Sequence, residues 1–151
     1  MATILVIEDN PTNMRLAVLV LEKAGHVVAC ATDAESGLLR ARADPPDLIL
    51  MDIQLPAMDG LEATRLLRRD PLTAAIPVIA LTALAMKEDQ ERSIAAGCNG
   101  YISKPLRYLQ LYALIDSLLP AGVRAATAGA SDAAASATAA TMNAATAESA
   151  P

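Results

Sequence analysis

The amino-acid sequence predicts an α/β fold in which helices cover both faces of a five-stranded parallel sheet. Two observations carry this prediction. First, short β-rich runs alternate with helical segments five times along the chain, which is the pattern of repeated strand–helix units. Second, residues 48–52 are apolar up to a final Asp52 and are bounded by prolines, as expected of a strand buried on both faces.

The chain begins with a β-rich run at residues 3–7, and a helix is expected at residues 11–24. Asn10 is a favourable N-cap and Pro11 suits the first helical position, whereas Gly25 is typical of a helix C-terminus. At 100° per residue, the inward stripe of this helix comprises Leu16, Ala17, Val20, Leu21 and Ala24.

Met14 and Val18 fall on the flank of that stripe, four residues apart. They fit scattered surface apolar residues and part of a partner-docking face equally well.

A second strand is expected at residues 26–31, with His26 as a surface histidine at its start. Asp33 or Thr32 then caps a helix at residues 34–43, which a double proline ends before the central strand.

A third helix is expected at residues 60–69, with leucines on its inner side. Its three arginines are interpreted as a solvated face and are Arg65, Arg68 and Arg69.

The second half of the domain repeats the pattern. Strands are expected at residues 76–81 and 100–103, and helices at residues 87–96 and 107–119. Gly97 ends the first of these helices and a proline follows the second.

Composition separates a domain at residues 1–120 from a low-complexity Ala/Thr/Ser tail at residues 121–151, which we expect to be disordered. A net charge of −5 and a pI of about 4.7 argue against a nucleic-acid surface. Cys30 and Cys98 lack metal-site spacing and are expected to be small buried residues. Without a spanning apolar run or a basic leader, the protein is expected to be cytoplasmic and not inserted in a membrane.

Polar side chains follow four of the five expected strands: Glu8 with Asp9, then Asp52, Thr82 and Lys104. Because the carboxyl ends of parallel strands share one edge of the sheet, these side chains should lie together. Crowded carboxylates need a cation, and oxygen ligands favour a hard divalent ion such as Mg²⁺. This set suits phosphoryl transfer, with Asp52 as the nucleophile.

These residues occur within a wider set of short motifs, namely Glu8-Asp9, Met51-Asp52, Pro56, Met58-Asp59-Gly60, Thr82-Ala83 and Lys104-Pro105. The set resembles the receiver domain of two-component response regulators over about residues 2–120. The resemblance implies a flavodoxin-like three-layer sandwich with strand order 2-1-3-4-5. Residues 51–56, 85–87 and 97–105 resemble single-domain cell-cycle regulators. Receivers attached to hybrid histidine kinases share much of this sequence.

The resemblance also implies a role for each site residue. Asp52 would be the phosphoacceptor, Thr82 and Lys104 would bind the phosphoryl group, and Tyr101 would be the switch aromatic. The implied Mg²⁺ ligands are Glu8, Asp9, Asp52 and the backbone carbonyl of Gln54. At the position two residues beyond Thr82, Leu84 is unable to orient a water molecule, which implies slow self-dephosphorylation.

The function expected from this resemblance is a single-domain response regulator rather than an enzyme that turns over a substrate. It would take a phosphoryl group from a histidine kinase or histidine phosphotransfer protein and signal to a downstream protein, as a monomer or weak dimer. A phosphorelay intermediate is the alternative. An aspartyl-phosphate phosphatase is less favoured, because Gln54 stands where such enzymes want a second acid. A nucleotide-binding module is disfavoured because neither GxGxxG nor GxxxxGK[ST] is present.

Overall fold

The computed structural model describes residues 2–83, 87–104 and 106–119. The predictions for the tail at residues 121–151 and for Leu84 lie outside these ranges. Five strands and five helices alternate along the described chain. Their bounds are β1 Thr3–Ile7, α1 Pro11–Lys23, β2 Val27–Ala31, α2 Ala34–Ala43, β3 Leu48–Asp52, α3 Gly60–Arg69, β4 Val78–Thr82, α4 Lys87–Ala96, β5 Gly100–Ser103 and α5 Tyr108–Leu118.

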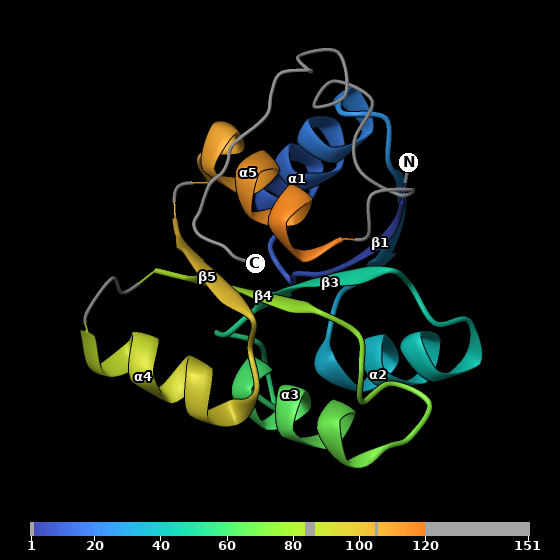
Figure 1. Ribbon diagram of the computed structural model, residues 1–151, viewed down its shortest axis with the longest axis vertical. Coiled ribbons are helices and arrows are strands. Elements are labelled where there is room, and N and C mark those ends of the chain that lie inside the picture. The colour runs from blue at the N-terminus through green and yellow to red at the C-terminus, as the bar shows by residue number, and fades with distance from the viewer. Residues whose placement is uncertain (1, 84–86, 105, 120–151) are drawn as a thin grey trace.

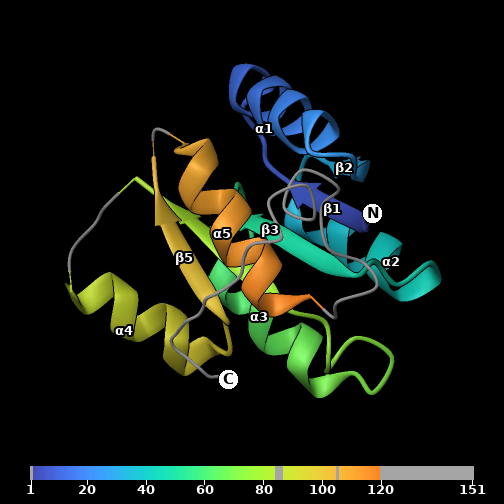
Figure 2. The same cartoon turned by 45° about the horizontal axis from the view of Figure 1, so that its top comes forward.

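The strands form one parallel sheet in the order β2-β1-β3-β4-β5. Helices α1 and α5 cover one face, and α2, α3 and α4 cover the other (Figures 1 and 2). The predicted fold, a flavodoxin-like three-layer sandwich with strand order 2-1-3-4-5, is therefore confirmed.

Element boundaries differ from the sequence-based expectation by only one or two residues. The largest shift is at β4, which begins at Val78 rather than at residue 76. Pro77 has no N–H to give to the ladder, although its carbonyl still accepts the N–H of Ile49 at 2.9 Å.

Alternate residues of the central strands pack into two aliphatic cores, one on each face of the sheet. In β3, Leu48 and Leu50 contribute to the core under α1 and α5, whereas Ile49 and Met51 contribute to the core over α2, α3 and α4. All five residues of β3 are buried, as its apolar composition predicts. Asp52 is thereby held at the end of the most enclosed strand.

The inward stripe of α1 is narrower than its sequence predicts. Ala17, Leu21 and the cap residue Ala24 are buried, but Leu16 is 41% exposed. Met14, expected on the flank of the stripe as a surface residue or part of a docking face, is partly buried and packs against the core. The angular pattern located the apolar side, but contact with the sheet and α5 decided which residues it buries.

His26 is buried, and its interpretation as a surface histidine was wrong. Its side chain is 4% exposed, and its Nδ1 accepts the backbone N–H of Ala2 at 3.1 Å. Burial lowers the pKa of the imidazole, because charging it there loses hydration. The partner lies just before β1, 24 residues away, so no local pattern reveals it.

The two cysteines differ. Cys98 is buried as expected, but Cys30 is exposed and free, so that half of the prediction was wrong. Cys30 lies on β2, which the strand order places at an edge of the sheet. Of the helices in the described ranges, none has the length and apolarity to cross a membrane.

Candidate functional site

The polar residues predicted at the strand ends do gather at one edge of the sheet. Glu8 follows β1 and Asp52 ends β3, and each is only 1% exposed. Thr82 ends β4 and is also buried, whereas Asp9 is exposed. Lys104 directly follows β5, and its backbone N–H donates to the carbonyl of Thr82 at 2.7 Å. Parallel strand ends thus assemble a site from residues nearly 100 positions apart.

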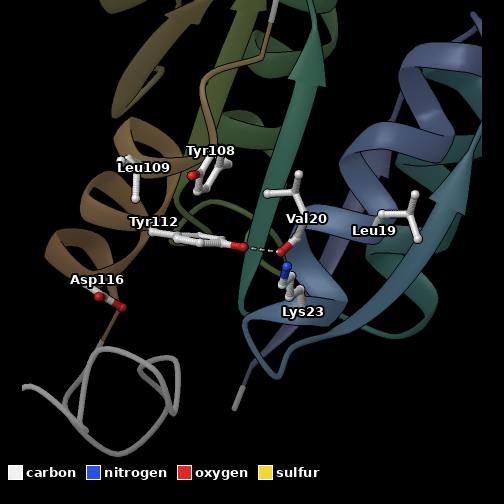
Figure 3. Close-up of a pocket in the computed structure, with 7 residues that line it drawn as sticks. All are labelled: Leu19, Val20, Lys23, Tyr108, Leu109, Tyr112 and Asp116. Atoms are coloured by element: carbon white, nitrogen blue, oxygen red, sulfur yellow. Dashed lines mark hydrogen bonds between the residues drawn. The ribbon is translucent and has the colours of Figure 1, made fainter.

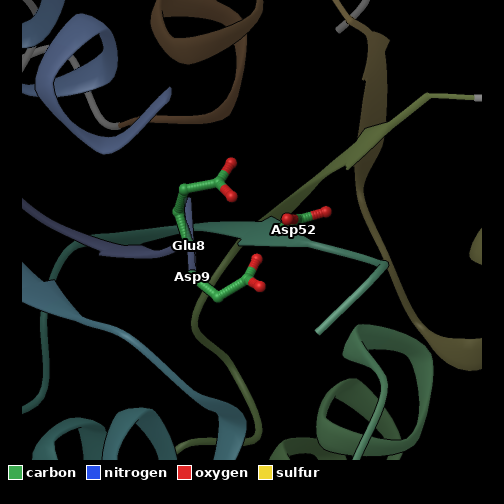
Figure 4. Close-up of side chains that lie close together, drawn as sticks. All are labelled: Glu8, Asp9 and Asp52. Atoms are coloured by element: carbon green, nitrogen blue, oxygen red, sulfur yellow. The ribbon is translucent and has the colours of Figure 1, made fainter. Parts of the chain in front are cut away.

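Three carboxylates converge at this edge. Glu8, Asp9 and Asp52 each offer one oxygen, and these three atoms all lie within 4.8 Å of one another (Figure 4). Two of the three side chains are withdrawn from water, so their mutual repulsion is poorly screened. Such a cluster favours a bound cation.

Lys104 provides one compensating charge within the protein. Its Nζ lies 3.1 Å from Asp52 Oδ2 and 3.3 Å from Glu8 Oε1. Burial by itself lowers the pKa of Lys104, but the two carboxylates outweigh it and the net shift is upward. The lysine therefore stays protonated, and its one positive charge contacts two of the three carboxylates in the cluster.

Glu8 is the carboxylate most affected by this excess of negative charge. Its Oε2 accepts the backbone N–H of Asn10 at 3.1 Å, but among the described residues buried Oε1 has no hydrogen-bond partner, despite its ion-pair distance to Lys104. Burial, with the neighbouring Asp52, raises the pKa of Glu8 to about 7. An under-satisfied buried oxygen among all-oxygen donors fits a divalent ion of the Mg²⁺ type.

The pH dependence of stability should report on Glu8. Its raised pKa means that the unfolded chain releases this proton near pH 4.5 but the folded chain only near pH 7. Without divalent ions, this contribution to stability is full below pH 4.5 and is lost as the pH rises through about 7. Glu8→Gln cannot ionise, so we expect its urea-unfolding free energy to fall less than that of the wild type between about pH 5 and about pH 8 in EDTA.

Mg²⁺ provides the second arm of this experiment. At about pH 8 it should restore stability to the wild type and much less to Glu8→Gln, because the variant lacks one carboxylate ligand. Parallel pH profiles for the two proteins in EDTA would contradict this account of Glu8.

The loop that follows Asp52 turns sharply. Asp52 Oδ1 accepts the backbone N–H of Gln54 at 3.0 Å, so the loop orients the carboxylate. Gln54 itself is exposed, two residues beyond Asp52. The carbonyl of Ile53 then accepts the N–H of Gly60 at 2.8 Å, which returns the chain to the start of α3. Between them Ala57 has φ of 64°, in the left-handed region.

Ala57→Gly should stabilise the fold. Left-handed backbone costs an L-residue about 1–2 kcal/mol, which glycine avoids at the expense of some unfolded-state entropy. We expect urea unfolding to show a gain of about 0.5–1 kcal/mol. The control is Ala95→Gly on α4, where the helical backbone favours alanine, and a loss of about 0.5–1 kcal/mol is expected. A loss at Ala57 as well would be inconsistent with strain there.

Tyr101 is half-buried in β5, with its Cα paired to Ala80 of β4, and packs against the core over α2, α3 and α4. It therefore lies beside the strand that ends in Thr82, on the sheet face covered by α4. The sequence analysis did not assign two groups to the site. One is the backbone N–H of Asn10, which donates to Glu8, and the other is Gly60, which was noted only as part of a motif. A contact between Gly60 and the backbone of Asp52 is invisible in sequence.

A separate groove of about 650 Å³ lies between α1 and α5 and shares no residue with the carboxylate cluster (Figure 3). Leu19, Tyr108 and Leu109 line much of it, and the hydroxyl of Tyr112 crosses it to donate to the carbonyl of Val20 at 2.7 Å. With mainly apolar walls, this groove does not compete with the sheet edge as the place of chemistry.

Comparison with known families agrees with this geometry. A model of the response regulator receiver domain matches residues 4–116, which include every predicted site residue. The chain belongs to the response regulator receiver domain family.

Among individual proteins, the chain is 44% identical over 117 residues to the polar-differentiation response regulator DivK of Brucella anthropi. The match covers 78% of this chain and 95% of that protein. The same protein from Brucella abortus matches at the same identity and coverage.

Solved structures give the same result. The receiver domain of the sensor histidine kinase PA1611 from Pseudomonas aeruginosa, solved with magnesium in its active-site cleft, is 35% identical with a TM-score of 0.73. The match covers 78% of this chain and 96% of that one. The chemotaxis protein CheY4 of Vibrio cholerae is 26% identical with a TM-score of 0.74, covering 79% of this chain and 99% of that one.

Proposed function

We propose that this protein is a single-domain response regulator that accepts a phosphoryl group on Asp52 and signals to protein partners in the cytoplasm. One observation carries the proposal: Asp52, buried at the end of the central strand, lies 3.1 Å from Lys104 in a cluster of three carboxylates. A lone buried carboxylate would repel the negatively charged phosphoryl group. A lysine and a cation-binding set beside it make the transfer favourable.

The donor is a phosphohistidine of a histidine kinase or histidine phosphotransfer protein. An oxygen of Asp52 forms a bond to phosphorus as the phosphorus–nitrogen bond breaks, and the histidine keeps that electron pair and takes up a proton. Lys104 neutralises charge on the transferred group, and the hydroxyl of Thr82 donates to one of its oxygens. Glu8, Asp9, Asp52 and the backbone carbonyl of Gln54 would hold Mg²⁺. When bound, the ion supplies further positive charge at the phosphoryl oxygens.

The signal passes from the site through β4 and β5 to the surface formed by α4, β5 and α5. The phosphoryl group adds about −1.5 to −2 charge, which draws Thr82 and Lys104 toward it. Tyr101 on the neighbouring strand turns inward as the connection after β4 moves, which changes the surface of α4, β5 and α5. This is a shift between two populated states. The net charge of −5 favours protein partners over nucleic acid, with the chain as a monomer or weak dimer.

Labelling with radioactive acetyl phosphate and Mg²⁺ tests the proposal. The expected result is up to one base-labile phosphoryl group per chain, and no labelling when EDTA is present from the start. Sustained turnover of p-nitrophenyl phosphate would overturn it in favour of an aspartyl-phosphate phosphatase. Passage of the label from the protein to a histidine phosphotransfer protein would identify a phosphorelay intermediate instead of a terminal regulator.

A further inference from the structure

Helix α4 is held firmly at only one of its ends. Its two buried residues, Ser93 and Ala96, both lie in its last four positions. None of residues 87–92 is buried, and Ile94 is 64% exposed. In both overall views α4 lies beside α3 at the edge of the sheet (Figures 1 and 2). Burial alone therefore gives the C-terminal end of α4 more stability than its N-terminal end.

Arg68 of α3 reinforces that C-terminal end. Its Nε and Nη2 donate to the carbonyl of Gly97, immediately after α4, at 3.0 and 2.8 Å. Its Nη1 donates to the carbonyls of Ala74 and Ile76 in the α3–β4 connection, at 3.1 and 2.7 Å. Arg68 was predicted to belong to a solvated face, and that prediction was wrong. Because no sequence pattern links it to these carbonyls, only the folded chain reveals its partners.

Asn99 extends these contacts into the sheet. Its Oδ1 accepts from Arg68 Nη2 at 2.8 Å and from the backbone N–H of Val78 at 2.9 Å. Its own N–H donates to the carbonyl of Val78 at 2.8 Å. We call Arg68, Gly97 and Asn99 the clasp. It joins α3, the end of α4 and the first residue of β4, at the end of that strand opposite to Thr82.

Gly97 is shaped for the clasp. Its φ of 110° is rarely adopted by other residues, and a Cβ there would lie 2.8 Å from Arg68 Cγ and 3.1 Å from Arg68 Nε. The arginine side chain thus passes directly across the glycine. Charge-assisted bonds to several carbonyls, with close packing, resist displacement of this end of α4.

We propose that the clasp is the pivot of the signalling movement. Arg68 fixes the C-terminal end of α4, and α4 responds to the phosphorylated site as a lever whose N-terminal end moves. The input end fits this assignment, since β4 ends at Thr82 and the chain leads from there to Lys87 at the start of α4. The inference rests on the proposed function, because the movement begins with a phosphoryl group at Asp52. Arg68 is a positioning residue and takes no part in the chemistry.

Amide hydrogen exchange of the full chain tests the pivot, with Mg²⁺ present and with or without beryllofluoride as the phosphoryl mimic. In the wild type, exchange in residues 87–92 should change by about threefold or more, and exchange at residues 97–99 by less than about twofold. In Arg68→Met, the beryllofluoride-dependent change should spread to residues 97–99. Arg69→Met, which removes an exposed arginine from the same helix, should retain the wild-type pattern.

A merely structural Arg68 would behave differently, because its loss would raise exchange at residues 97–99 equally with and without beryllofluoride. That result overturns the pivot, as does a wild-type change at residues 97–99 equal to that at 87–92. The wild-type measurement stands even if Arg68→Met fails to fold. Acetyl phosphate labelling separates the two proposals: normal labelling with either of those exchange patterns rejects the pivot alone. Absence of both labelling and any beryllofluoride effect rejects the pivot and the proposed function together.

Discussion

Asp52→Asn is expected to abolish Mg²⁺-dependent labelling by acetyl phosphate or by a cognate kinase. The amide has nearly the same volume and its oxygen can still accept the N–H of Gln54, now 3.0 Å from Asp52 Oδ1. It is, however, a far weaker nucleophile than a carboxylate and adds no negative charge to the cation site. The measurement is phosphoryl incorporation per chain at saturating acetyl phosphate.

Asp59→Asn is the matched control for this substitution. Asp59 is an exposed N-cap whose side chain accepts the N–H of Glu62 at 2.8 Å, and asparagine caps helices about as well. This variant should therefore be labelled like the wild type. Undiminished labelling of Asp52→Asn, with a folded protein by circular dichroism, would remove Asp52 as the phosphoacceptor.

Gly60→Ala should produce the largest loss of stability among the glycine substitutions considered. A Cβ at Gly60 would lie 2.3 Å from the carbonyl oxygen of Asp52 and 2.8 Å from the Cα of Ile53. Both are backbone atoms, and they belong to the end of the most buried strand and to its loop. Because neither can rotate away, α3 must shift, and we expect a loss of about 3 kcal/mol or more in the urea-unfolding free energy.

Gly37→Ala offers the informative comparison. Its Cβ would also clash, at 2.4 Å from Ile7 Cδ1 and 2.8 Å from Ile7 Cγ1, but these are side-chain atoms that can change rotamer. Alanine also regains about 1 kcal/mol of helix propensity inside α2. A net loss of about 1–2 kcal/mol is expected. The reverse order of the two losses would mean that α3 is not seated against the backbone of Asp52.

Gly60 contributes to the site through its lack of a side chain. With no side chain at this position, the first turn of α3 reaches the loop that orients Asp52, and the Gly60 N–H bonds to the carbonyl of Ile53. A Gly60→Ala protein that still folds should therefore be labelled more slowly as well, since a displaced loop misplaces the carboxylate.

The regular elements and most of the site were determined by the sequence itself, because both depend on local chemistry. Caps such as Asn10 and Asp33 and the glycines after α1 and α4 act within one turn of helix, so they delimit the helices wherever these pack. Likewise, parallel strands place their carboxyl ends at one edge, so strand-final Asp52 and Thr82 had to lie along the same edge once the strands were identified. The strand order itself came from family resemblance and was confirmed by the structure.

Tertiary structure alone decided the features that depend on a distant partner. Buried His26 accepts the N–H of Ala2 from the segment before β1, the exposure of Cys30 follows from the edge position of β2, and Arg68 is held by carbonyls of connecting segments. Such partners leave no periodic trace, because a carbonyl is present in every residue and becomes an acceptor for a particular side chain only when the fold brings it there. The sequence by itself determined where the chemistry is; packing determined what holds that chemistry in place.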